Sequence, residues 1–322
     1  MNDVLHEIQS VGIGIEPFTE PQSQLDNSSA ILNWLSGTLK EVHLIAVVNP
    51  EDLRWPGDIE DDGWAAEIQR RVIEDLKARF KVPNADYAIH FDVLIRKIPS
   101  RSKTVKHFLS FATEQKIDLL IIHSHTKSDL LTSLGSFCNN VVALSRLPIL
   151  IIPLGIQIRY PLKLILFPTD FSGLSKVAYE AVVQLAKPLQ SAIKIYHRTA
   201  RPIDEVMQIA LHPFKSKAVM PADIVILNDS MIEAKARSWT DWASSVGGTS
   251  TFVQDTEKVT LPGSIAARAK KDHVDLIALP THTSELNIAS VGSAVCHLLR
   301  ASSVPVLVIP CPYVSPGNFP NE

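Results

Sequence analysis

Short apolar runs alternate with segments of helical periodicity along most of the chain. After the apolar run Leu164–Phe167, apolar residues recur every three or four positions from Leu174 to Ala186, a spacing that predicts an amphipathic helix. Ser172 is a candidate N-cap for this helix, and Pro188 is expected to end it. Short continuous apolar runs are typical of strands that are covered on both faces. The alternation therefore predicts an α/β fold with a parallel sheet between helical layers.

The same order of elements occurs in both halves of the chain. Strands of the first half are predicted at Val11–Ile15, Val42–Val48, Ala88–Ile95, Leu119–Ile122 and Ile149–Ile152. Strands of the second half are predicted at Leu164–Phe167, Ile193–Tyr196, Thr251–Gln254, Leu276–Leu279 and Val304–Ile309. Further helices of the second half are predicted around Met231–Ser244, after Pro262 and after Gly292.

An internal repeat sets the predicted number of domains. Residues 118–153 align without gaps on residues 275–310, and 12 of the 36 aligned positions are identical. A repeat offset of about half the chain indicates duplication of a whole domain, in contrast to the short period of a solenoid. We therefore predict two repeated, doubly wound parallel-sheet domains of five strands each, at residues 1–156 and 157–322. An insertion is expected in the second domain at about residues 198–222.

Composition narrows the class of protein. Hydrophobic residues make up 46% and charged residues 20% of the 322 residues, which excludes a disordered chain. The net charge of −3 argues against a nucleic-acid binder, and three cysteines are too few for a disulfide framework. The most apolar stretch, Leu147–Ile156, is too short to span a bilayer, and the first residues lack the pattern of a signal peptide. A cytoplasmic protein is expected.

A Gly-Ser pair precedes the last helix of each copy, at Gly135-Ser136 and Gly292-Ser293. The start of a helix offers unpaired N–H groups that suit a phosphate, although a serine there can equally be a plain helix cap. With only 13 glycines in the chain, the composition weakens any claim of a glycine-rich phosphate loop.

At this unit the chain resembles the universal stress protein family in its tandem form. The likeness rests on LKLILFPTDFSGLSKVAYEAVVQLAKPL, which opens the second copy, and on the DLI…THT…GS…PVLVIP block that ends it. The resemblance implies a Rossmann-like fold and, in some members, a bound adenine nucleotide. Members that bind it have a motif of three glycines. Two residues separate the first glycine from the second, nine separate the second from the third, and serine or threonine follows the third. The segments aligned here are His123–Thr126 and Pro280–Thr283, which lack both early glycines and have a spacer of eight residues. Proline has no N–H to donate, so tight binding of ATP is disfavoured.

Asp170 follows the first strand of the second copy. The resemblance implies that this position contacts the adenosine part of a nucleotide, and the alternative is an Asx turn or a cap of the next helix. The first copy has Glu16-Pro17 there, so the second copy is the better candidate. The predicted ligand-binding residues of the second domain are Thr169, Asp170, His282, Thr283, Gly292 and Ser293, and those of a degenerate site in the first domain are Gly135 and Ser136.

The sequence gives less support for a metal site, a redox cysteine or a catalytic residue than for the ligand site of the second copy. His123 and His125 lie two apart at a strand end, but no third ligand is evident and no metal site is predicted. Cys138 and Cys296 are interpreted as small buried residues, with a redox sensor as the alternative. We find no pairing of a nucleophile with a base and predict no catalytic residue. Three prolines divide the segment 198–222, which is interpreted as a lid over a pocket or as a segment packed on its own domain.

The resemblance implies a stress-response protein. The residues discussed above predict that it is non-catalytic and cytoplasmic and that it binds a small molecule or a protein partner. The alternatives are an adenine-nucleotide switch in the second domain, a second-domain pocket for an apolar molecule, and a slow nucleotide hydrolase. The resemblance implies that single-domain members dimerise through their last strands. The two copies can make this contact within one chain, through Ile149–Ile152 and Val306–Ile309, as an intrachain pseudo-dimer. Association into a homodimer stays open.

Overall fold

A computed structural model describes most of the chain. The described residues are 8–18, 20–48, 62–82, 86–95, 101–124, 136–198, 221–246, 250–255, 260–283 and 293–312. Within them, no helix is both long and apolar enough to cross a bilayer.

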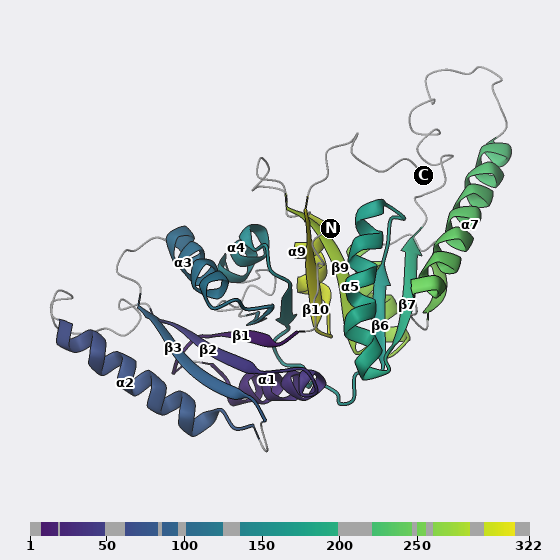
Figure 1. Cartoon of the computed structure of the whole chain (residues 1–322). Helices are drawn as coiled ribbons and strands as arrows, with labels where there is room; N and C mark the ends of the chain where they lie inside the picture. The colour runs from purple at the N-terminus through teal and green to yellow at the C-terminus, as the bar shows by residue number, and fades with distance from the viewer. Residues whose placement is uncertain are drawn as a thin grey trace, which may run out of the picture.

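Each half of the chain alternates strands with helices (Figure 1). The first half consists of β1 (Ser10–Ile15), α1 (Gln22–Leu35), β2 (Glu41–Val48), α2 (Asp62–Arg79), β3 (Ala88–Ile95), α3 (Arg101–Glu114), β4 (Leu119–His123), α4 (Ser136–Leu144) and β5 (Ile149–Ile152). The second half consists of β6 (Leu164–Pro168), α5 (Gly173–Leu189), β7 (Ala192–Arg198), α7 (Pro221–Val246), β8 (Ser250–Asp255), α8 (Leu261–Lys271), β9 (Leu276–Thr283), α9 (Ser293–Ala301) and β10 (Val306–Pro312).

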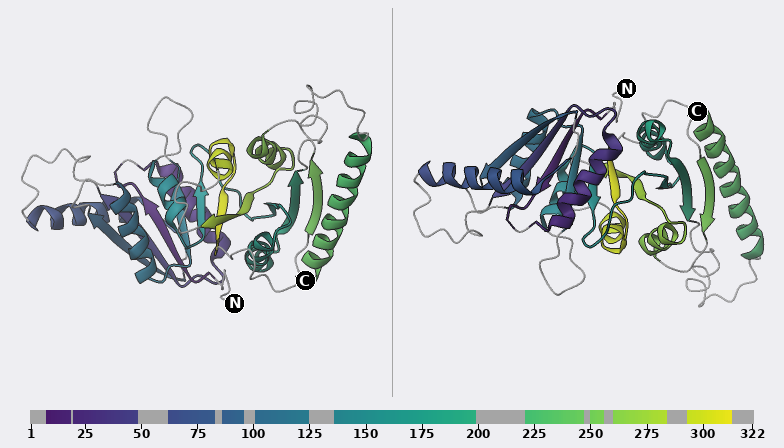
Figure 2. Two further views of the ribbon diagram at one scale, coloured as in Figure 1. Left: turned by 90° about the horizontal axis from the view of Figure 1, so that it is seen from above. Right: turned by 90° about the horizontal axis from the view of Figure 1, so that it is seen from below.

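The strands form one ten-stranded sheet in the order β3-β2-β1-β4-β5-β10-β9-β6-β7-β8. Neighbouring strands within each half are parallel. The halves meet at an antiparallel pair in which Leu150 of β5 lies opposite Leu307 of β10. The sheet is therefore continuous across both halves, and α2 and α7 lie at opposite ends of the molecule (Figures 1 and 2). This confirms the predicted intrachain pseudo-dimer of two five-stranded units.

Helices cover both faces of the sheet, as expected of a doubly wound fold. One buried apolar cluster packs α1, α2, α5 and α7 against the strands, and a second packs α3, α4, α8 and α9 against the other face. Both clusters contain residues of both halves, so the apolar core does not stop at the boundary between them.

Several residues that are identical in the repeat support the scaffold. Asp118 accepts hydrogen bonds from the backbone N–H groups of Gln9 and Ser10, each at 2.9 Å. Asp275 makes the equivalent bonds to Lys163 and Leu164, at 3.0 and 3.1 Å.

Ser145 and Ser302 close identical turns before the last strand of each half. Each hydroxyl accepts a hydrogen bond from the N–H two residues later and donates to the carbonyl of that residue. The backbone repeats as well, because Phe18 and Phe171 follow the first strands with φ of 65° and 63°. The duplication is thus visible in the structure even where the sequences of the copies differ.

Some elements extend beyond their predicted ends. Helix α5 continues one residue past Pro188 and ends where Gln190 adopts the left-handed conformation. Helix α7 already begins at Pro221, and proline suits the first turn of a helix. Strand β9 runs on through Pro280 to Thr283, paired with β10. Most of the expected insertion, residues 199–220, lies outside the described residues, so its interpretation as a lid stays a prediction.

Candidate functional site

Ligands of doubly wound sheets bind at the carboxyl ends of the strands, where the strand order reverses. In the second half that point lies between β6 and β9, and Thr169 and Asp170 directly follow β6. Thr169 is buried, and its backbone N–H donates to the carbonyl of Tyr196 at 2.9 Å. Its hydroxyl accepts a hydrogen bond from the N–H of Phe171 at 2.9 Å. Thr169 therefore shapes the loop that presents Asp170.

Asp170 is exposed and turns one carboxylate oxygen back toward α5. Its Oδ1 accepts from the backbone N–H of Ser172 at 2.9 Å and from the hydroxyl of Ser175 at 2.7 Å. Partial burial of the carboxylate opposes ionisation, but these hydrogen bonds outweigh it and lower the pKa of Asp170 below its ordinary value. Among the described residues no hydrogen bond to Oδ2 is present. Asp170 thus forms the Asx turn and keeps one anionic oxygen for another group.

The segment that replaces the early glycines is part of a strand. Pro280, Thr281 and Thr283 lie opposite Ile309, Pro310 and Pro312 of β10. An extended, paired strand does not curl its N–H groups around a phosphate as a glycine-rich loop does. Gly292 lies outside the described residues, as do the side chains of His282, Thr283 and Ser293. Their part in a ligand site stays a prediction.

In the first half, polar side chains of the chain itself meet near the corresponding point between β1 and β4. His123, the last residue of β4, places Nε2 at 2.9 Å from the hydroxyl of Ser28 on α1. Its Nδ1 lies 3.1 Å from Oε1 of Glu20, and neither of these two side chains has any exposed surface. Ser28 is also completely buried. We name these three residues the buried lock, because they join α1 to the end of β4.

The buried lock has the connectivity of a serine hydrolase triad without its accessibility. A nucleophile must reach a substrate, and Ser28 has no surface at which it could do so. Both ring nitrogens of His123 have a polar neighbour within the lock, so His123 is not free to bind a metal. His125 and Gly135 lie outside the described residues, as does the side chain of Ser136. Sequence analysis singled out His123 but missed Glu20 and Ser28, which lie about a hundred positions away.

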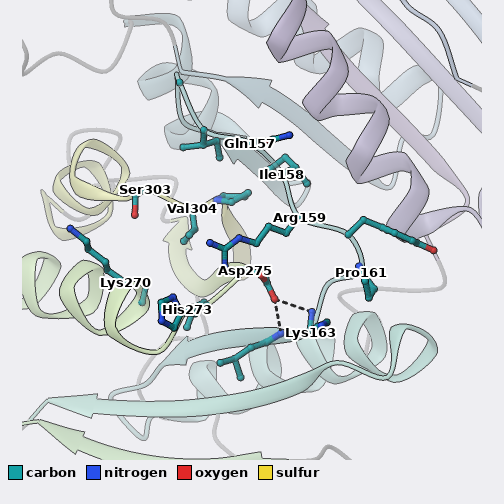
Figure 3. A pocket seen from close by; sticks show the side chains of 17 residues that line it. Gln157, Ile158, Arg159, Pro161, Lys163, Lys270, His273, Asp275, Ser303 and Val304 are labelled. Carbon is teal, nitrogen blue, oxygen red and sulfur yellow. Dashed lines mark hydrogen bonds between the residues drawn. The ribbon is translucent and has the colours of Figure 1, made fainter.

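A cavity of about 970 Å³ lies at the opposite edge of the sheet (Figure 3). It is bounded by the linker, the segment 153–163 between β5 and β6, and by the amino ends of β6, β9 and β10. Four of its labelled side chains are basic or imidazole groups: Arg159, Lys163, Lys270 and His273. Asp275 also faces it, but its carboxylate is held by the two backbone bonds drawn as dashed lines. This cavity is therefore not the carboxyl-edge site that the fold predicts.

Cys138 is buried on α4. Burial, with a smaller contribution from nearby Cys296, raises the pKa of the Cys138 thiol to about 12. Because the thiolate is the reactive form, this environment is typical of a structural cysteine.

Comparison with known proteins settles the family of the second half. A model of the universal stress protein family matches residues 161–310. This segment is a universal stress protein domain. A search of curated proteins finds no significant match to the chain.

Solved structures extend the fold to the whole chain. A universal stress protein from Archaeoglobus fulgidus DSM 4304 superposes with a TM-score of 0.66 at 15% identity, over 96% of this chain and 98% of that chain. A protein named as a universal stress protein from Pseudomonas aeruginosa UCBPP-PA14 gives a TM-score of 0.57 at 13% identity, over 94% of each chain. At these identities the likeness shows the fold alone. Both halves thus have the fold of a universal stress protein domain, arranged in tandem.

Proposed function

We propose that this chain is a cytoplasmic stress-response protein that acts by binding, with the second domain as its binding half and no catalytic step. The observation that carries the proposal is the difference between the two carboxyl edges. In the first half the buried lock ties the last residue of β4 to α1 and to Glu20, and its side chains have no exposed surface. In the second half Asp170 is exposed and keeps Oδ2 for a ligand or partner. We place the two domains at residues 1–156 and 157–322.

We infer the absence of catalysis from the fact that a substrate cannot reach Ser28. Within the described residues, the buried lock is the arrangement that most resembles a nucleophile with its base, and it has no surface. Slow hydrolysis of a nucleotide would require a positioned water and a metal near the phosphates, whereas Asp170 is proposed here to contact the nucleoside. The paired course of β9 through Thr283 further supports weak binding of a triphosphate.

An adenine-nucleotide switch is the alternative that Asp170 favours. A carboxylate oxygen at the end of a first strand can accept hydrogen bonds from ribose hydroxyls, as an acidic residue does in other doubly wound folds. Such a ligand would be recognised through its nucleoside, with the phosphates held loosely. AMP and ATP would then bind with similar affinity.

The deciding experiment combines mass spectrometry of small molecules released from the denatured protein with calorimetry of ATP and AMP on the full chain. Asp170→Asn is the informative variant, because its amide oxygen can still accept from Ser172 and Ser175 while the second carboxylate oxygen is lost. If a nucleotide binds through Asp170, affinity should fall about tenfold or more, as expected for a hydrogen bond to a charged group.

Asp26→Asn is the control, since this exposed carboxylate on α1 bonds to the side chain of Gln22. An adenine nucleotide released at one equivalent, together with loss of affinity in Asp170→Asn alone, would establish the switch. No released molecule and no heat of binding would support a protein-binding module. Binding that Asp170→Asn leaves unchanged would contradict a nucleotide site at this residue.

A further inference from the structure

Two histidines and two carboxylates gather on one face of β2 and β3, at the free edge of the sheet. His43 lies directly opposite His90 in the strand pairing, and Ile45 lies opposite Asp92. Glu41 is two residues from His43 and shares its face, because alternate residues of a strand point the same way. Ligand atoms of Glu41, His43 and His90 lie within 4.8 Å of one another. These residues are at the amino end of β2, away from the carboxyl edge discussed above.

The orientation of the His43 ring is set by Asp92. Nδ1 of His43 lies 2.9 Å from Oδ2 of Asp92, and a carboxylate can only accept a hydrogen bond there. The proton is therefore on Nδ1, and in the neutral ring the lone pair is on Nε2. A carboxylate behind the ring in this way is the usual arrangement around a histidine that binds a metal, where it fixes both the tautomer and the direction of the ring.

Nε2 of His43 is buried and makes no hydrogen bond among the described residues. A buried polar atom without a partner is costly, and each such atom in a folded protein calls for an explanation. Oε2 of Glu41 is the nearby anionic group, at 3.7 Å, beyond hydrogen-bond length. The ring of His90 stacks on that of His43 with centroids 4.6 Å apart. Nε2 is thus an electron-pair donor in a cluster that holds two further possible ligands.

We propose that Glu41, His43 and His90 bind a divalent transition-metal ion such as Zn²⁺, with Asp92 positioning His43. Two imidazoles and one carboxylate are an established ligand set for zinc, and water completes the tetrahedron. Ligand atoms around zinc lie about 3.4 Å apart, so the site must contract on binding. His43 is held in place, whereas the side chain of Glu41 is 53% exposed and His90 is also exposed, so both can move toward it. The Phe111 ring, 6.4 Å from that of His43, adds an apolar wall.

The test is calorimetry of Zn²⁺ with chelator-treated full-length protein. We expect one saturable equivalent, weakened at least tenfold in His90→Ala and in Glu41→Gln, both of which change exposed side chains. Asp92→Asn should also weaken binding about tenfold or more without removing a ligand. Co²⁺ should give the absorption spectrum of a tetrahedral site in the wild type and not in His90→Ala.

His107→Ala is the matched control, because it removes an exposed histidine of α3 that is not part of the cluster. Its affinity for Zn²⁺ should equal that of the wild type. The proposal is overturned if the wild type shows no saturable binding. It is also overturned if His90→Ala and His107→Ala bind Zn²⁺ equally well, since binding would then be at another group such as a cysteine.

Discussion

The carboxylates of this chain have different roles that depend on their position in the fold. Asp118 and Asp275 each satisfy two backbone N–H groups at the start of a first strand, and a buried donor without an acceptor costs about 1–3 kcal/mol. That structural role explains their presence in both copies. Asp170, by contrast, is replaced by Pro17 at the equivalent position of the other copy, directly before Phe18. For these carboxylates, the two that are shared by the copies support the scaffold, and the one that differs lies at the candidate site.

The cap made by Asp170 should depend on pH. Because its folded pKa lies below the ordinary value of 3.8, ionisation favours the folded state. This stabilisation is fully present above the unfolded pKa and is lost as pH falls through the folded pKa. The free energy of unfolding of the wild type relative to Asp170→Asn should thus be constant between about pH 5 and 8 and decrease below about pH 4. Urea unfolding over this range tests it, and a difference that persists unchanged in acid would refute it.

The positions of Thr169 and Asp170 could be predicted because both follow a strand that is evident in the sequence. The buried lock and the cluster around His43 could not. His43 and His90 are 47 positions apart and meet through the pairing of two strands, whose register no local pattern reveals. Ser28 was indistinguishable from any polar residue of an amphipathic helix until its contact with His123 was seen.

The apolar pattern of the sequence predicted the strands and helices well where these elements are buried. All ten strands were predicted, because central strands of a parallel sheet are apolar throughout. The predictions differ from the structure at the ends of elements, where an adjacent strand or the local turn decides how far the element extends. Strand β9, predicted at Leu276–Leu279, extends past Pro280 to Thr283 because β10 continues beside it. Pro221 was interpreted as part of the insertion, yet it opens α7.

The end of α5 offers a test at this scale. Gln190 caps the helix in the left-handed conformation, with φ of 54°, and its N–H donates to the carbonyls of Ala186 and Lys187. A residue with a Cβ is strained there by about 1 kcal/mol, and glycine is not. Gln190→Gly should therefore raise the free energy of unfolding by about 0.5–1 kcal/mol in urea titrations. Gln190→Ala keeps the Cβ and should give no such gain, so an equal effect of both variants would argue against strain.

At the scale of the whole molecule, the two halves share one sheet and two apolar cores. The linker after β5 is not needed to hold them together if this shared core is strong enough. An intrachain contact that resembles a dimer interface should persist without the covalent connection, as it does between separate subunits.

Cleavage of the linker tests this expectation. A specific protease site placed between Leu154 and Ile158, where the chain runs along the surface, should be cut without separating the halves. The two fragments should elute together from a sizing column at micromolar concentration. Leu307→Lys, which places a charge opposite Leu150 in the buried seam, should make them elute apart after cleavage. Fragments of the uncharged chain that separate on cleavage would show that the linker, and not the shared core, maintains the assembly.

The antiparallel contact of β5 with β10 also has an evolutionary consequence. In a symmetric dimer of identical subunits every substitution appears twice, once on each side of the axis, so both sites change together. Fusion of the copies removes that constraint. One half can lose a binding site and be retained as a permanent folding partner, while selection acts on the other half alone. A first domain held by the buried lock and a second domain that binds a ligand, as proposed above, are a difference between the halves that such a history permits.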